Sequence, residues 1–348
     1  MKTKKIKEEK ISVFGRIKSK ISDKFYDLSV CIAEKTNKNK KKANLNTVAS
    51  EKKKQTIFYF ALIALPFLHY LIFYVGVNFN SILLAFKEYK DVDGQAQHVL
   101  TGFIQFETIF ENLIYGDQLR QMISNSLIYY TIHLIVGIPL ALFFSFYIYK
   151  KYFFSEFFRV MLFLPSIISS VVTVFMYTNM VEHGVVDVFY AFGKEIPYPM
   201  GIPNFQIYAV LIFNIIMGFG TGVLMYASAM TRIPVSVVEY AQLDGVSPFK
   251  EFISITIPLV FDTISTFLIV GIASIFTNQY NIYTLFHDQA GNNVASLGYH
   301  LYVLVNLGNS EANFPYAAAL GLLCTFVAVP LTFTMRWLLG KINPDVQY

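Results

Sequence analysis

The sequence predicts an all-α membrane protein with six transmembrane helices and both termini in the cytoplasm. Of its 348 residues, 55% are hydrophobic and only 15% are charged, whereas a typical soluble domain is about 25% charged. The mean hydropathy is +0.48. This composition excludes a disordered protein, a disulfide scaffold and most soluble enzymes. The two cysteines, Cys31 and Cys324, lie far apart in the chain and indicate neither a disulfide nor a metal cluster.

Six stretches of the chain are long and apolar enough to cross a bilayer. The hydrocarbon core is about 30 Å thick, so a helix needs about 20 apolar residues to span it. We expect the fourth helix to begin near Gln206 and the fifth near Ile257. Prolines inside the stretches should kink the helices without excluding them, because neighbouring helices satisfy the freed backbone groups. These prolines are Pro66, Pro139, Pro165 and Pro330. The stretches are residues 57–79, 121–149, 160–181, 196–231, 263–287 and 312–335.

The distribution of basic residues predicts the orientation of these helices. Cytoplasmic segments of membrane proteins carry an excess of Lys and Arg. With the N-terminus inside, the cytoplasmic segments hold 24 of the 28 basic residues, and the outer loops hold the other 4. The cytoplasmic segments in this arrangement are residues 1–54, 150–159, 232–256 and the C-terminal tail.

The first 54 residues form a basic arm with a pattern of its own. Apolar side chains recur every three or four positions from Phe14 to Ile32, with basic side chains between them. Residues 14–32 are therefore expected to form an amphipathic helix that lies on membrane lipids; packing against another cytoplasmic subunit is the alternative. Residues 35–54 are rich in Lys and Asn and are expected to be a solvated linker. A basic arm can also bind nucleic acid, but the apolar stretches that follow favour lipids.

The longest cytoplasmic connection between spans, residues 232–258, carries the most informative pattern. A short amphipathic helix is expected after Pro234 and a break at Gly245. Ser247 and Pro248 then open a second helix. Two short helices on the cytoplasmic face would give a soluble partner a raised surface to bind.

This connection resembles the EAA loop of binding-protein-dependent ABC importer permeases. The residues that match the loop at its spacing are Glu239, Ala241, Asp244, Gly245, Phe249, Phe252, Ile255 and Pro258. The chain departs from the pattern at Tyr240, where the family usually has Ala, and at Ile257, where it usually has Leu. The resemblance extends over about residues 100–340 and leaves out the basic arm. Three further segments are similar to sugar permeases of the maltose/glycerol-3-phosphate type: residues 158–165, 184–187 and 314–320.

The resemblance implies a permease subunit of an ATP-driven ABC importer in a bacterial cytoplasmic membrane. A sugar or oligosaccharide would pass into the cytoplasm from an extracytoplasmic solute-binding protein. The implied partners are a second, related permease and a separate ATPase dimer, which binds the ATP and Mg²⁺; membrane lipids are expected partners and nucleic acid is not. We expect three domains: the basic arm at 1–54, the six-span permease domain at 55–340 with the cytoplasmic coupling loop 232–258, and a cytoplasmic tail at 341–348. By this resemblance, the residues that couple to the ATPase are Glu239, Ala241, Asp244, Gly245, Phe249 and Pro258.

Three pairs of small or polar residues lie at helical spacing within the predicted spans, where polar groups tend to face the bundle interior. Each pair is expected on one face of its helix, roughly where related sugar permeases line their binding site. Helix packing is the alternative explanation, because small residues also let membrane helices approach closely. Tyr129, Tyr130 and His133 are weaker candidates. The pairs are Ser166 with Ser170, Asn214 with Gly218, and Ser274 with Asn278.

The sequence contains no P-loop and no H-E-x-x-H motif, and no catalytic triad can be argued from it. We therefore expect a protein that is not an enzyme and holds no metal or cofactor of its own. An ATP-independent secondary transporter is the alternative, and that class is expected to carry ionisable residues in mid-membrane. Asp262, near the cytoplasmic end of the fifth span, is the only acid in the span-dense regions. A membrane scaffold or sensor is a third hypothesis.

Overall fold

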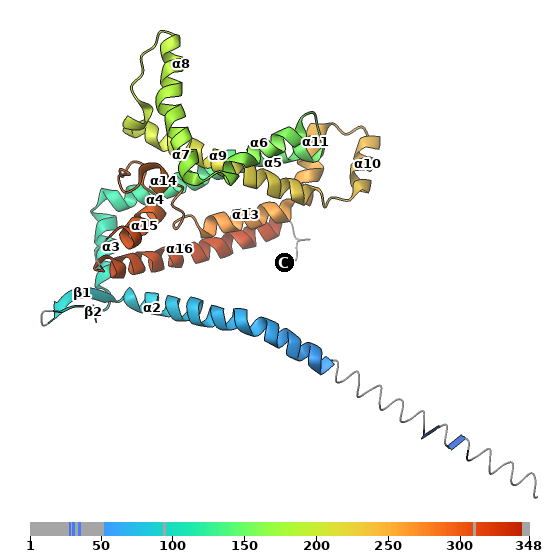
Figure 1. The fold of residues 1–348 in the computed structure, drawn as a ribbon, viewed down its shortest axis with the longest axis horizontal. Helices are drawn as coiled ribbons and strands as arrows, with labels where there is room; N and C mark the ends of the chain where they lie inside the picture. Colours follow the sequence, from blue (N-terminus) through green and yellow to red (C-terminus); the bar gives the residue numbers. More distant parts are fainter. Residues whose placement is uncertain are drawn as a thin grey trace, which may run out of the picture. The chain divides into compact units, whose positions relative to one another are not determined.

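The computed structural model in Figure 1 is mostly helical. It describes residues 28, 30, 31, 34, 35, 52–92, 95–308 and 311–342. The chain separates into two units, Met1–Asn78 and Phe79–Tyr348. The predicted amphipathic helix at 14–32 and the predicted tail at 341–348 lie almost wholly outside the described residues.

Four described helices are long and apolar enough to cross a membrane. Two further pairs of helices pass the same test together, and each pair is bent at a short break, so the number rises to six if each pair is one span. The bend is 105° between Ser155–Ile167 and Ser170–Ala191, and 67° between Pro248–Leu259 and Phe261–Ala273. The four single helices are Lys52–Leu84, Asp117–Tyr149, Pro203–Met230 and Asn313–Ile342.

The connection after the first helix contains structure that the sequence analysis did not predict. The first helix, Lys52–Leu84, contains a π turn, η1 (Tyr70–Gly76), and ends with α2 (Val77–Leu84). An antiparallel hairpin of β1 (Lys87–Val92) and β2 (Gln95–Leu100) follows, in which Lys87 pairs with Leu100. The chain then forms α3 (Ile104–Ile114).

The helix Asp117–Tyr149 is continuous but not uniform, because the π turn η2 (His133–Gly137) separates α4 (Asp117–Ile132) from α5 (Ile138–Tyr149). Pro139 is the second residue after this turn. The next elements are α6 (Ser155–Ile167), α7 (Ser170–Asn179), η3 (Met180–Gly184), α8 (Val185–Ala191), η4 (Pro199–Gly201) and α9 (Pro203–Met230). The remainder comprises α10 (Val235–Leu243), α11 (Pro248–Glu251), η5 (Phe252–Thr256), α12 (Ile257–Leu259), α13 (Phe261–Ala273), α14 (Ile282–Phe286), α15 (Leu297–Asn306) and α16 (Asn313–Ile342).

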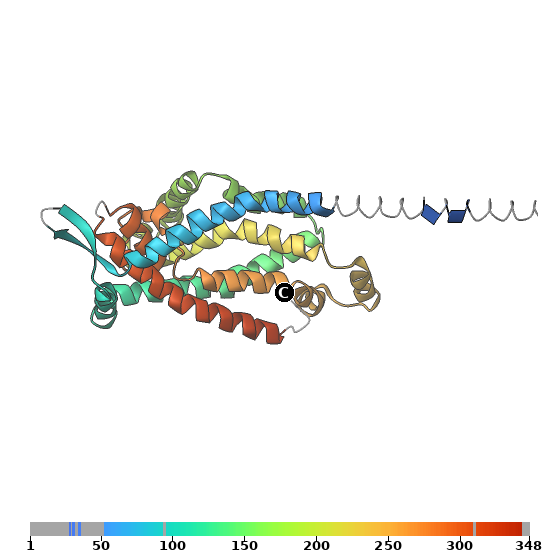
Figure 2. The ribbon, with the colours of Figure 1, turned by 90° about the horizontal axis from the view of Figure 1, so that it is seen from below.

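Within the unit Phe79–Tyr348, α9 is the central packing element. Both α5 and α6 pack against it, while α13 packs against α16. Figure 2 shows α5, α9, α13 and α16 running alongside one another. The buried Ser145 of α5 donates a hydrogen bond of 2.9 Å to the Val223 carbonyl of α9, so the two helices are joined by a polar contact as well as by apolar packing. In Figures 1 and 2, the hairpin and α10 lie at opposite ends of this unit.

The predicted third span is broken soon after Pro165. Proline lacks a backbone N–H and clashes with the preceding turn, which weakens a helix at that point. The helix ends at Ile167, and Ile168 and Ser169 adopt extended backbone angles before α7 begins. The prediction that Ser166 and Ser170 share one helical face is therefore wrong, because they lie on opposite sides of a 105° bend.

The predicted fifth span is also shorter than expected. Its helix ends at Ala273, and residues 274–281 form turns that lead into α14. The prediction that Ser274 and Asn278 lie on one face of a helix is therefore wrong. Hydropathy could not reveal the end of this helix, because the uncharged stretch continues to His287. The fourth helix begins at Pro203, slightly before the position predicted.

Candidate functional site

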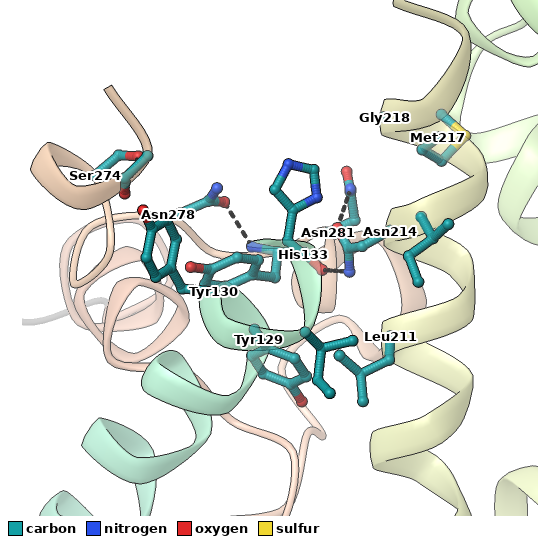
Figure 3. Close-up of a pocket in the computed structure, with 14 residues that line it drawn as sticks. Tyr129, Tyr130, His133, Leu211, Asn214, Met217, Gly218, Ser274, Asn278 and Asn281 are labelled. Carbon is teal, nitrogen blue, oxygen red and sulfur yellow. Dashed lines mark hydrogen bonds between the residues drawn. The ribbon is translucent and has the colours of Figure 1, made fainter. Parts of the chain in front are cut away.

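A cavity of about 420 Å³ lies between α4, η2, α9 and the end of α13 (Figure 3). Its wall combines residues from α4, η2, α9 and α13 with residues from the turn that follows α13. The lining residues are Tyr129, Tyr130, Ile132, His133, Leu211, Asn214, Ile215, Met217, Gly218, Gly271, Ser274, Asn278, Tyr280 and Asn281. The wall thus offers amide, hydroxyl and imidazole groups within an otherwise apolar surface.

Several of the sequence-predicted path residues come together at this cavity. Two of the three predicted pairs line it in full: Asn214 with Gly218, and Ser274 with Asn278. The weaker candidates Tyr129, Tyr130 and His133 line it as well. Ser166 and Ser170 do not, and the Ser166 hydroxyl donates a hydrogen bond of 2.7 Å to the carbonyl of Phe163 in its own helix.

The turn after α13 supplies two cavity residues that the sequence analysis missed, Tyr280 and Asn281. Both have positive φ angles, 50° and 53°. Such left-handed backbone costs energy for residues with a Cβ and persists only where surrounding contacts enforce it. Asn281 is of a residue type that tolerates left-handed backbone, but the turn contains no glycine or proline, and its uncharged sequence favours a continued helix.

Asn214 of α9 supplies the contacts that hold this turn. Its amide nitrogen donates hydrogen bonds to the carbonyls of Tyr280, at 2.6 Å, and Val210, at 2.8 Å. Its amide oxygen accepts a hydrogen bond of 2.8 Å from the Asn281 amide. Within the turn, the Tyr280 backbone N–H donates to the Asn278 side-chain oxygen at 2.9 Å. Figure 3 shows Asn214 directed at Asn281. Asn214 therefore holds in place the turn that forms this part of the cavity wall.

We expect replacement of Asn214 to perturb the cavity more than replacement of Asn278. Asn214→Leu leaves the Tyr280 carbonyl and the Asn281 amide without their partner, and each unpaired buried polar group costs ~1–3 kcal/mol. Asn278→Ala removes one hydrogen bond within the turn and one amide that faces the cavity. We expect this loss to lower solute-stimulated ATPase activity by about tenfold at most. Measurement of solute-stimulated ATPase activity and of complex assembly in both variants tests whether Asn214→Leu has the larger effect. Normal activity in both would mean that neither amide matters to the cavity.

The segment after α9 forms the helix–turn–helix expected from the sequence. The helix α10 ends at Leu243, and Gly245 follows with a φ of 67°. The Val246 N–H donates to the Ala241 carbonyl at 3.0 Å and the Gly245 N–H to the Gln242 carbonyl at 3.1 Å. This pair of bonds is the Schellman motif, which glycine favours because it has no Cβ to clash in the left-handed region.

The second helix of this segment begins as the sequence predicts. The Ser247 hydroxyl accepts a hydrogen bond of 3.4 Å from the Lys250 N–H, and Pro248 occupies the first helical position. Proline suits this position because its missing N–H has no helical partner there. The order of Ser247 and Pro248 therefore confirms the predicted start of the helix.

One side of the helix–turn–helix is exposed and the other is anchored. The large side chains of Tyr240, Leu243 and Phe249 are exposed, Leu243 by 81%. Ala241 and Phe252 are buried, and Phe252 belongs to the core that α5, α9 and α13 share. Exposed apolar side chains so close together mark a binding surface more often than a solvated loop.

The predicted coupling residues are divided between the two sides. Ala241 lies on the buried side, whereas the others are exposed: Glu239, Asp244, Gly245, Phe249 and Pro258. The sequence analysis missed Glu251, which is buried and pairs with Lys150 across a distance of 2.5 Å between Nζ and Oε1. The partner of Glu251 is remote in the sequence, so no local pattern could have revealed it.

The chain thus combines helices long enough to cross a membrane, a cavity with polar groups and an exposed helix–turn–helix. Residues 134–348 match the family described as "Binding-protein-dependent transport system inner membrane component". Since the match covers more than half of the chain, the protein belongs to this family.

Individual relatives agree with this assignment. The chain is 22% identical to protein LplB of Bacillus subtilis over 290 residues, which covers 82% of this chain and 89% of LplB. It is 24% identical to the multiple sugar-binding transport system permease protein MsmF of Streptococcus mutans, over 54% of this chain and 64% of MsmF. It is 25% identical to the galactooligosaccharides transport system permease protein GanP of Bacillus subtilis, over 72% of this chain and 62% of GanP.

A solved structure has the same fold. A chain of a bacterial ABC transporter involved in the import of the acidic polysaccharide alginate superposes with a TM-score of 0.71 at 19% identity. The superposition covers 84% of this chain and 98% of that chain. The fold is therefore that of an ABC importer permease.

Proposed function

We propose that the chain is one of two permease subunits of an ATP-driven importer in a bacterial cytoplasmic membrane. In this proposal each bent helix pair is one span, which makes six spans with both termini in the cytoplasm. The subunit passes a polar solute inward from an extracytoplasmic binding protein. The observation that carries the proposal is the exposed helix–turn–helix around Gly245, at the opposite end of its unit from the hairpin (Figure 1).

The distribution of charge supports this orientation. Residues 1–54 hold 17 of the 28 basic residues, and the positive-inside rule assigns such a segment to the cytoplasm. Counting six spans from there assigns α10 and α11 to the cytoplasm and the hairpin β1–β2 to the outside. The solute-binding protein then meets the hairpin end, and the ATPase meets the exposed side chains of α10 and α11.

We infer that the solute is an uncharged polar molecule, most simply a neutral sugar or oligosaccharide. The cavity is lined by amides, hydroxyls and an imidazole, without Lys, Arg, Asp or Glu among its lining residues. Hydroxyl-rich solutes exchange hydrogen bonds with such groups. A carboxylate in the same place would lose its hydration without a counter-charge, which is costly in a low-dielectric interior. Relatives named for multiple sugars and for galactooligosaccharides support a saccharide.

ATP hydrolysis belongs to a separate subunit in this proposal. The sequence has no P-loop to hold the phosphates, so ATP and Mg²⁺ bind to the partner ATPase. Glu239, Asp244 and Gly245 lie where that ATPase docks, and Phe249 adds exposed apolar area beside them. Closure of the ATPase dimer then moves the helix–turn–helix and opens or closes the solute path.

Purification from its native membrane tests this proposal. We expect the tagged chain in mild detergent to retain a second permease and an ATPase, and we expect ATP hydrolysis to rise when solute-loaded binding protein is added. A stable, transport-competent monomer would contradict the proposal. Uptake that continues in vesicles depleted of ATP would instead favour a secondary transporter.

A further inference from the structure

A buried ion pair joins the helix–turn–helix to the end of α5. Lys150 comes directly after α5, and Glu251 is the last residue of α11. The Lys150 Nζ lies 2.5 Å from Glu251 Oε1, and the two side chains are only 12% and 7% exposed. Two charges removed from water in this way stabilise a structure only while they stay together, because loss of one leaves the other buried and unpaired.

Aromatic contacts surround this pair and make the junction rigid. The ring of Phe252, next to Glu251, lies 5.1 Å from the ring of Phe146 in α5. The Lys150 ammonium lies 5.7 Å from the Phe146 ring and 6.0 Å from the Tyr149 ring, within the range of cation–π attraction. The end of α11 is therefore fixed to α5, while Tyr240, Leu243 and other large side chains nearby remain exposed.

The helix that ends at this junction is one of those that line the cavity. Asp117–Tyr149 is a single continuous helix, and Tyr129, Tyr130 and His133 of that helix face the cavity. From His133 to Lys150 the helix covers about 25 Å at ~1.5 Å per residue. A movement of α11 that pulls on Lys150 therefore acts on the element that carries four cavity residues, Ile132 among them.

We propose that Lys150 and Glu251 are positioning residues that transmit movement of the helix–turn–helix to the cavity wall. This inference rests on the proposed function, because it requires an ATPase that moves α10 and α11. It adds a defined route: α11, the ion pair, α5, η2 and the cavity side chains of α4. The pair acts through the helix and does not touch the solute.

Charge reversal and charge exchange test this route on the complete transporter. The variants are Lys150→Glu, Glu251→Lys and the double exchange of both. The matched control is Lys151→Glu, which makes the same charge change at the exposed neighbouring position. Each variant is assayed for its amount in the membrane, for retention of the ATPase, for the ratio of solute-stimulated to basal ATP hydrolysis, and for uptake.

We expect both single reversals to lower uptake by about tenfold or more and to bring the stimulation ratio close to one. The amount of complex and the basal hydrolysis should change little. The double exchange should recover much of the stimulation, because it restores the pair with opposite polarity, and the control should behave like the wild type. A purely structural role would change the amount of complex and leave the stimulation ratio of the surviving complex normal.

Three results would overturn the inference: normal stimulation in either single variant, a double exchange as defective as the single variants, or a control as defective as Lys150→Glu. If the charge-reversed variants fail to accumulate in the membrane, Glu251→Gln is measured instead, because it keeps the shape of the side chain and removes its charge. Normal stimulation of ATP hydrolysis in Glu251→Gln would reject the proposed route through the ion pair. If the wild-type complex itself shows no ATPase and no uptake, the proposed function fails instead, so the two failures are distinguishable.

Discussion

Replacement of Gly245 with valine is expected to abolish coupled transport while the helices remain inserted in the membrane. Gly245 has a φ of 67° and closes the Schellman motif that ends α10. A residue with a Cβ adopts this backbone at a cost of ~1 kcal/mol or more, and a β-branched residue pays the most. No atom lies within 4 Å of the position that a Cβ would occupy. The added side chain would therefore disturb the turn and the approach of a partner, without disturbing the core.

The measurement is membrane insertion, ATPase retention and uptake in the same cells. Gly245→Asn is the matched control, because asparagine tolerates left-handed backbone better than other residues with a Cβ, and it should keep much of the uptake. Glu239→Lys should resemble the valine variant, since it reverses a charge on the same exposed surface. Normal uptake by Gly245→Val would return the segment to the status of an ordinary connecting loop.

Replacement of Gly220 with valine is expected to destabilise the bundle itself. Gly220 is buried in α9, where α6 crosses it. A Cβ at this position would collide with the Leu162 carbonyl and would lie 2.7 Å from its carbon and 2.9 Å from the Cα of Phe163. These are backbone atoms, so the helices must separate. Overpacking of this kind costs ~1–3 kcal/mol or more, and small residues are what allow membrane helices to approach so closely.

The thermal unfolding midpoint of the purified complex, together with its amount in the membrane, measures this effect. Gly218→Ala serves as the control, because Gly218 lies in the same helix and its Cβ would meet no atom within 4 Å. The midpoint should fall clearly for Gly220→Val and stay close to the wild-type value for Gly218→Ala. Equal midpoints in the two variants would show that α6 and α9 do not pack as closely as described.

The sequence predicted those features that depend on local signals. The starts of the two short helices were predicted from Pro234 and from Ser247–Pro248, and the turn between them was predicted from Gly245. These signals are local, because helix caps and left-handed turns depend on neighbouring residues alone. Long apolar stretches likewise located helices. The unpredicted part depends on distant contacts: the turn at Tyr280 is held by Asn214, which is 66 residues away in the sequence.

Composition also cannot locate the end of a helix where the hydropathy of the sequence stays the same beyond that end. The end of α13 lies inside a stretch without charged residues, so hydropathy could not separate the helix from the turns that follow. For the same reason the apolar pattern predicts one helical face for Ser274 and Asn278, whereas both residues lie in the turns after α13, where they line the cavity. The buried pair of Lys150 and Glu251 had no sequence signal, because its two members are about 100 residues apart in the chain.

The π turn η2 has a consequence for how this helix can change during evolution. It lies between the cavity residues of α4 and Lys150, and its wider winding sets the angle at which the two ends of the helix face their neighbours. A π turn holds one residue more than regular winding needs, so loss of one residue at η2 would leave the two ends of the helix facing as they do now. Loss of one residue from the regular winding of α5 would instead rotate one end by about 100° relative to the other, and Tyr130 and Lys150 could not then both face their present neighbours. Single-residue insertions and deletions in α5 should therefore be selected against, whereas a deletion at η2 should be tolerated.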